Sequence, residues 1–468
     1  MGNVTKSQQN NITSPNGNSL AVFVEGTTGV MKVKDVMGNI QPLSDFVGGS
    51  GGSSPFEYNA NTTGIQPILG TNNATGCFST IGGGCINTAS SLWSTIGGGQ
   101  DNCASGVLST IGGGHCNTAI STRSTIVGGK YNTAGNINSY YGSQFVGAGS
   151  KNTASGEFSA VVGGYCNTSS GLLSFVGGGG GYLSIGNVAS GSYSSVVGGT
   201  KNNATGYISN IGGGSLNSAT DNFSTVGGGQ SNTASGANSF IGGGQDNCAF
   251  GVWSTIGGGV DNNVCLRSGV IGGGEINTAS GCVSTIGGGR KNTASGRLSL
   301  VGGGYFNNST NYASTIGGGT CNVASNYFST VGGGINNTVS NSYSTVGGGQ
   351  SNTVSGYRST VGGGFCNIAS SFYSIVGGGY CNTASGFNST IGGGYENNAF
   401  GCFSTIVGGR NNVTCSFTCV VIAGSYITAD RNCATFVNNL SIKSIPTSGA
   451  GLPSGSIYRI GNAVCIVI

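Results

Sequence analysis

Branched aliphatic residues recur along most of this chain at a fixed interval of 15 residues. The series begins at Ile81, Ile96 and Ile111 and runs on to Ile406, and we place its last member at Val421. Around each of these anchors, which we count as position 0, the polar and small residues follow the consensus N-T-A-S-G-x-x-S-T-I-G-G-G-x-x. A repeat this short cannot bury its own apolar side chain, so the pattern predicts a stack of coils that share one core.

Each repeat has room for two short strands and two turns. Because side chains alternate across a strand, the S-T-I segment points the anchor and the Ser at −2 to one face. The N-T-A-S segment likewise points Asn at −9 and Ala at −7 to one face, and we expect these four positions to form the interior. The inward asparagines, such as Asn87, Asn102 and Asn117, would then stack as an amide ladder that satisfies buried polar groups. Glycines at +1 to +3 and at −5 are expected to supply turns with positive φ.

The predicted fold class is all-β: a parallel β-solenoid, or β-roll, of 15-residue coils with small β-rich modules at both ends. The expected parts are an N-terminal β-rich module at 1–47, a Gly/Ser-rich hinge at 48–64, the solenoid at 65–424 and a C-terminal β-rich cap or assembly module at 425–468. Two intervals between anchors are 20 residues long, which indicates five-residue insertions near Tyr140 and near Gly180. Insertions that leave the phase intact are expected in loops outside the stack.

Position −3 carries a bulky side chain in most repeats, and aromatic residues at −4 join it in the later ones. One interpretation is an exposed apolar stripe that forms a subunit interface, with a three-fold bundle favoured over a pair. The other is that these side chains cover a corner of their own coil. The residues proposed for the interface are Trp93, Phe158, Tyr193, Phe223, Trp253, Phe328, Tyr343, Tyr373 and Phe403.

Composition excludes several classes of protein. Glycine accounts for 96 of the 468 residues but not for every third one, so the chain is not collagen-like. Charged residues make up only 6% and the net charge is +4, without the basic stripe of a nucleic-acid-binding protein. The run Cys419–Ala423 is too short to span a bilayer, and we identify no signal peptide at the start of the sequence.

Candidate chemistry is sparse. The single histidine, His115, lies in a glycine-rich turn, and the twelve acidic residues form no recurring carboxylate pair. Asp101, Asp246 and Asp261 share position +5, but the Ca²⁺-binding repeat signature is missing. We therefore predict no enzyme activity, no cofactor and no metal.

The 16 cysteines contain no C-x-x-C pair and instead fall into repeat columns. Cys366 and Cys381 occupy position +5 of consecutive repeats, at a spacing that permits a disulfide. Free or partly buried thiols are the alternative, and the sequence leaves both open.

The S-x-I-G…N-x-A-x-G pattern over 65–424 resembles the head repeats of trimeric autotransporter adhesins. That resemblance implies a left-handed β-roll that trimerises, although the stalk and membrane anchor of the family are not seen. The segments SQQNNITSPNGNSLAVFVEGTTGVMKVKDVMGNIQPLSDF and IPTSGAGLPSGSIYRIGNAVCIVI look like terminal segments of virion structural proteins from tailed phages and large DNA viruses.

Together these features predict a structural subunit of a viral or extracellular fibre or fibril, on the virion surface or outside the cell. Its expected partner is itself, as a trimer or a filament, with a host surface glycan or receptor as a further partner. An adhesin or receptor-binding protein of cellular origin is the alternative. An ice-binding solenoid is a third, because Thr88, Thr118 and Thr153 share the −8 column; Asn263 and Ile368 interrupt that column.

Overall fold

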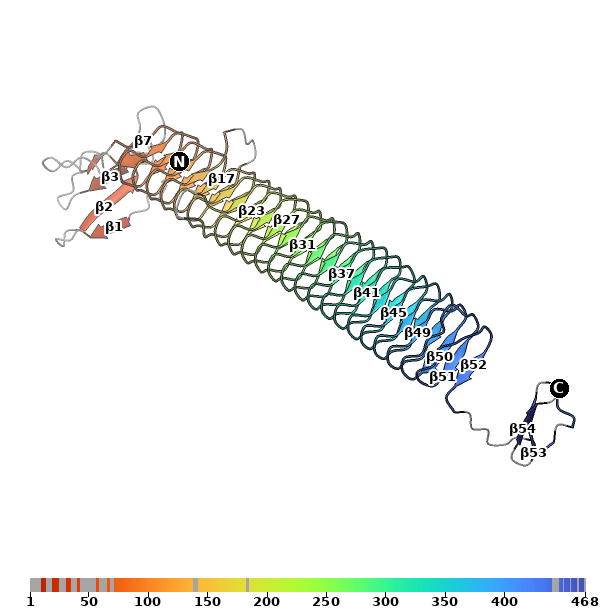
Figure 1. Cartoon of the computed structure of the whole chain (residues 1–468). Helices are drawn as coiled ribbons and strands as arrows, with labels where there is room; N and C mark the ends of the chain where they lie inside the picture. Colours follow the sequence, from red (N-terminus) through yellow and green to blue (C-terminus); the bar gives the residue numbers. More distant parts are fainter. Residues whose placement is uncertain are drawn as a thin grey trace. The chain divides into compact units, whose positions relative to one another are not determined.

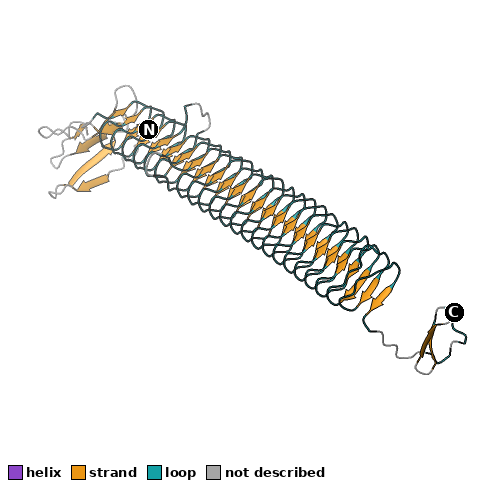
Figure 2. Ribbon diagram, viewed as in Figure 1, coloured by secondary structure: helices purple, strands orange, loops and turns teal. Residues whose placement is uncertain are grey.

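The computed structural model describes residues 71–137, 142–181 and 185–439 together with short segments at both ends: 10–13, 19–24, 31–34, 40–42, 56–58, 65–67, 446–448, 450–454, 456–460 and 463–466. Every regular element in these residues is a β-strand (Figure 2). The chain divides into two compact units, residues 1–223 and 224–468, and each is treated by itself below.

Unit 1 begins with an antiparallel sheet of four strands. Its strands are β1 (Asn10–Thr13), β2 (Ser19–Val24), β3 (Met31–Lys34) and β4 (Ile40–Pro42), paired in chain order. All four strands lie within residues 1–47, the range predicted as a β-rich module. Of the predicted hinge at 48–64, only β5 (Phe56–Tyr58) is described, and the rest of that prediction lies outside the described residues.

The repeats of both units form a parallel β-solenoid of about 24 coils, which confirms the predicted fold class (Figure 1). Each coil gives one two-residue strand to a first sheet, such as β10 (Thr95–Ile96), and one to a second sheet, such as β11 (Cys103–Ala104). In each sheet a residue pairs with its equivalent 15 positions away, as Ile96 does with Ile111. The register survives both 20-residue intervals, because Val146 pairs with Ile126 and Val196 with Val176. Most of each insertion, at 138–141 and 182–184, lies outside the described residues.

The first sheet starts in unit 1 at β6 (Ile65–Pro67), which pairs with both β5 and β8 (Thr80–Ile81). In unit 2 it ends with β50 (Thr405–Gly408), β51 (Val421–Ala423) and β52 (Thr435–Val437). Parallel pairing therefore continues past residue 424, where the 15-residue pattern stops. A separate hairpin follows, formed by β53 (Ile457–Ile460) and β54 (Ala463–Ile466).

The last anchor of the series was assigned to the wrong residue. Ile422, not Val421, pairs with Ile406 and is fully buried, whereas Val421 is 37% exposed. One extra residue enters this coil, and since side chains alternate along a strand, a shift of one position exchanges the inner and outer faces.

The interior of each coil holds the four positions that the sequence predicted. Anchors such as Ile286, alanines such as Ala279, serines such as Ser284 and asparagines such as Asn277 are all fully buried. One branched side chain and one methyl group per coil make a thin apolar core, so a large part of the interior is polar.

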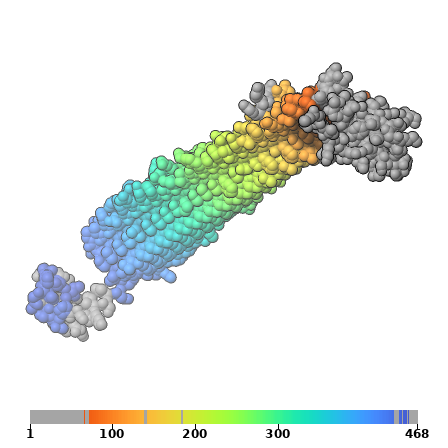
Figure 3. All heavy atoms as spheres, turned by 180° about the vertical axis from the view of Figure 1, so that it is seen from behind, coloured from red at the N-terminus to blue at the C-terminus, as the bar shows by residue number. Residues whose placement is uncertain are grey.

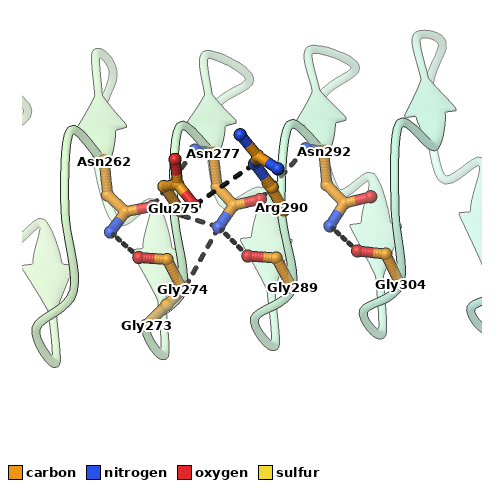
Figure 4. Close-up of polar contacts among 9 residues, drawn as sticks. All are labelled: Asn262, Gly273, Gly274, Glu275, Asn277, Gly289, Arg290, Asn292 and Gly304. Carbon is orange, nitrogen blue, oxygen red and sulfur yellow. Dashed lines mark hydrogen bonds and ion pairs between the residues drawn. The ribbon is translucent and has the colours of Figure 1, made fainter.

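The asparagines satisfy that polar interior as a continuous ladder within each unit (Figure 4). The Asn277 side-chain amide donates to Gly289 O at 2.9 Å and Gly273 O at 3.1 Å. Its Oδ1 accepts the backbone N–H of Asn292 at 3.0 Å. Because one side chain bonds backbone groups of its own coil and of the next, each asparagine fixes both the turn of its own coil and the spacing to its neighbour.

The glycines do not all act as expected. Glycine at +3 does have positive φ, as at Gly274 (φ 93°), but glycine at −5, such as Gly281, does not. A Cβ at Gly281 would overlap the carbonyl oxygen of Gly296 in the next coil, so close approach explains that glycine. Positive φ instead recurs at positions −3 and +5, which hold residues other than glycine, such as Trp93 (φ 54°) and Ile276 (φ 56°).

Candidate interaction surfaces

Four surfaces surround each coil, and we name them by position. The first corner comprises positions −5 to −3, and the second corner comprises +4 and +5. The first-sheet face carries positions −1 and +1, and the second-sheet face carries −8 and −6. In the space-filling view the side chains of successive coils lie in rows that follow the stacking direction (Figure 3).

The residues proposed for an interface all lie on the first corner of their own unit. Each has positive φ, which turns its backbone N–H toward the preceding coil, as Trp93 N–H donates to Cys77 O at 2.9 Å. Their side chains are between 39% exposed, for Tyr373, and 54% exposed, for Phe403. An αL backbone costs an ordinary residue about 1–2 kcal/mol, so these bulky side chains occupy a conformation that glycine would adopt more easily.

In unit 2 the first-corner rings contact one another from coil to coil. Phe328 and Tyr343 are stacked with centroids 5.1 Å apart, and Tyr343 meets Tyr357 edge to face at 5.7 Å. The contacts run from Tyr312 to Phe403, with −4 and −3 positions both taking part. The rings therefore pack along their own corner, and about half of each side chain still faces solvent. The subunit interface stays a prediction.

A second row of rings, which the sequence analysis missed, lies on the second corner of unit 2. Tyr380 stacks between Phe365 at 5.1 Å and Tyr395 at 4.8 Å, with nearly parallel planes. The 15-residue spacing of these three aromatic residues was the signal that could have revealed it. Since both faces of the Tyr380 ring are covered, this row presents ring edges outward.

Arginines lie over several of these rings. The guanidinium carbon of Arg267 is 4.3 Å from the Trp253 ring centroid, and that of Arg358 is 5.3 Å from the Tyr357 ring centroid. On the second corner, Arg290 pairs with Glu275 at 3.2 Å, with both side chains about half exposed (Figure 4). Contacts this exposed stabilise the fold by only about 0–1 kcal/mol each. They therefore contribute little to the stacking of the coils.

Charge is confined to the two corners. Every Asp, Glu, Lys and Arg between residues 71 and 413 occupies position −5, −4, −3, +4 or +5. The two sheet faces of these coils bear threonine, serine, asparagine, glycine and some apolar residues. On the first-sheet face, glycine at +1 leaves backbone uncovered in most coils, as at Gly287 and Gly302.

The cysteines occur as thiols in the described residues. Cys366 and Cys381 lie in adjacent coils within side-chain hydrogen-bonding contact, so the predicted disulfide remains a prediction. Burial, followed by the contact with Cys366, raises the pKa of the Cys381 thiol above its ordinary value. Burial likewise raises the pKa of Cys248, with Asp261 as the second cause. These thiols are therefore held in the protonated, less reactive form near neutral pH.

Groups suited to catalysis do not converge in the described residues. His115 contacts the ring of Tyr131, with centroids 5.4 Å apart, and its Nε2 lies 3.6 Å from Cys116 Sγ. Within the described part of the chain, no three His, Cys, Asp or Glu side chains are grouped so that they would hold a metal ion. In the same residues, no helix is long and apolar enough to cross a membrane.

Comparison with known proteins does not assign the chain to a family. No protein-family model matches the chain, and no curated protein is significantly similar to it.

Proposed function

We propose that this chain is a structural subunit of a viral or extracellular fibre or fibril and that it works as a homo-oligomer. The observation that carries the proposal is the uninterrupted repetition of one coil, with its register kept across two insertions. Each coil repeats the same interior, the same two corners and the same two sheet faces. A surface made in this way offers length and repeated contacts rather than a single site.

The distribution of side chains supports an assembly. A thin roll buries little apolar area per residue, so association with other copies would add the burial that it lacks. The first corner presents the apolar stripe proposed from the sequence, and its side chains remain about half exposed. We therefore retain the homotrimer as the favoured oligomer. The terminal modules are the proposed sites of end-to-end growth into a filament.

The test is the assembly state of the purified full chain. Mass photometry and negative-stain electron microscopy should find elongated oligomers or fibres, with trimers as the expected smallest unit. Immunolabelling of particles from the source should then place the chain on a fibrous surface layer. Monomers at every accessible concentration, or labelling restricted to the cell interior, would contradict the proposal.

A further inference from the structure

The first-sheet face presents fewer side chains than the second-sheet face. At position +1 a glycine usually presents only backbone, and the adjacent −1 residue is most often threonine. Where −1 is phenylalanine, its ring lies across the neighbouring glycine: the Phe240 ring comes within 3.6 Å of the Cβ position of Gly242. The same holds at Phe175 and Gly177, at 3.4 Å. One edge of each ring therefore lies over the neighbouring glycine.

The apolar side chains on this face are spaced along it. Between residues 240 and 300, Phe240, Val270 and Leu300 occupy −1 in every second coil and are 37–43% exposed, and Ile375, 43% exposed, follows after four coils with threonine. Further along, Val407 at +1 is 59% exposed. Threonines occupy −1 in the coils between these residues, as at Thr255 and Thr285. Apolar side chains are thus separated along this face by coils that carry a smaller hydroxyl side chain, and an equivalent surface can interdigitate with such a relief.

The second-sheet face is also free of charge but differs in its covering. It carries a side chain at both −8 and −6, most often Thr and Ser, as at Thr338 and Ser340. Burying that face would remove water from two hydroxyl groups per coil. The first-sheet face buries fewer side-chain hydroxyl groups, because glycine at +1 has no side chain, and its backbone N–H is bonded to the next coil, as Gly287 N–H is to Val301 O.

We propose that the first-sheet face packs against the same face of a second copy of this chain. The proposal deepens the assembly proposed above and rests on it, because it names a second contact surface, which joins copies in pairs, beside the aromatic first corner on which the trimer is proposed. A partner with ordinary surface charges would leave those charges without counter-charges here, whereas another copy supplies a flat and charge-free surface. The shared repeat also gives both copies one spacing between coils.

The area is of the order that such a contact needs. Coils about 4.8 Å apart and a face about 7 Å wide give unit 2 alone on the order of 500 Å², and the coils of unit 1 carry a face of the same kind. A stable interface buries roughly 800 Å² on each partner. Two sheets packed face to face lie about 10 Å apart, which the low relief of this face allows.

The experiment compares two matched double variants of the full chain. Thr345→Glu with Thr360→Glu places two carboxylates on the first-sheet face, in adjacent coils that pair with each other. Thr338→Glu with Thr353→Glu makes the same change on the second-sheet face of the adjacent strand pair. Both variants change the net charge equally. Mass photometry over a dilution series then measures the dissociation of each.

We expect the first-sheet variant to raise the dissociation constant at least about a hundredfold, because a buried unpaired carboxylate costs several kcal/mol. The second-sheet variant should dissociate like the wild type. Circular dichroism and thermal melting establish that each variant is folded. If the first-sheet double variant does not fold, Val407→Glu replaces it, with Phe400→Glu on the second-sheet face as its control; these side chains are 59% and 48% exposed.

The outcomes separate this proposal from the proposed function. An oligomer that survives both first-sheet variants but dissociates with Phe328→Asn and Tyr343→Asn overturns this inference and leaves the fibre subunit standing. An oligomer that dissociates with the second-sheet variant as readily as with the first also overturns it. A wild-type chain that is monomeric throughout overturns both proposals.

Discussion

A buried asparagine is the residue on which each coil depends most. The Asn277 side chain makes bonds to backbone of its own coil and of the next, and its Nδ2 also donates to Asn262 Oδ1 at 3.0 Å. The Ile/Val anchors supply apolar burial, but the asparagines decide where each turn lies.

Replacing this amide should therefore be costly. Asn277→Ala leaves Gly273 O and the Asn292 backbone N–H without their partner, and it removes one of the two donors to Gly289 O, which keeps the N–H of Glu275. We expect it to destabilise unit 2 by about 3 kcal/mol. Thr278→Ala, one residue away on the second-sheet face, should change stability by only about 0.5 kcal/mol. Chemical denaturation followed by circular dichroism measures both, and equal effects would contradict the ladder's role.

At one corner position with positive φ, by contrast, we expect that replacing an exposed isoleucine raises the stability of unit 2. Ile276 has φ 56°, a conformation that a β-branched side chain tolerates poorly and asparagine tolerates well. Ile276→Asn should thus raise the stability of unit 2 by about 1 kcal/mol. Ile368→Asn, the same change within strand β45 (Ile368–Ala369), should lower it. A loss of stability at Ile276 would show that its apolar contacts outweigh the backbone strain.

The Cys366–Cys381 pair allows a test by pH. Because burial raises the pKa of Cys381, little thiolate forms at neutral pH, and oxidation to the disulfide should be slow there. The rate should climb as the pH rises beyond about 8.5, the usual thiol pKa. Mass spectrometry of peptides after exposure to oxidised glutathione at pH 7 and pH 9 measures this. A linked pair that forms equally fast at both values would contradict the expectation.

At the scale of the element, period-two alternation was enough to predict the strands and the interior. Asn, Ala, Ser and Ile/Val each fall on the inner side of strands only two residues long, and no other assignment buries all four columns. The final anchor could not be placed in the same way. In Cys419–Ala423 several neighbours are apolar, so residue type does not distinguish the inner Ile422 from the outer Val421.

The positive-φ corners were also beyond the sequence pattern. Glycine is the usual marker of that conformation, yet positions −3 and +5 hold Trp, Leu, Asp, Lys and other types. Coil-to-coil hydrogen bonds impose the conformation there, as when Asp101 N–H donates to Cys85 O at 3.1 Å. These hydrogen bonds form only between stacked coils, so the sequence of a repeat does not reveal the conformation that they impose.

The coil as a unit can be tested by deletion. Removing residues 272–286 joins Ile271 to Gly287 and keeps every column in phase, so the shortened chain should fold with one coil fewer. Removing 272–285 leaves the columns one residue out of phase and directs the next anchor outward. Thermal melting should show a modest change for the first deletion and a large loss for the second. Similar melting curves would contradict the solenoid register.

At the scale of the whole molecule, the arrangement of charge is the most informative feature. The sequence already shows that each charged residue between 71 and 413 occupies one of five positions of the repeat. The structure places those five positions at the two corners, so the two sheet faces of these coils carry no charge. The aromatic first corner and the first-sheet face are distinct surfaces, and both are proposed to serve self-association.

The most direct test of the account is a cryo-EM reconstruction of the assembled full chain at a resolution that shows coils. The account predicts neighbouring copies with their first-sheet faces about 10 Å apart and their charged corners at the rim. A reconstruction in which the first-sheet face is open to solvent in every copy, or in which only single copies are found, would contradict it.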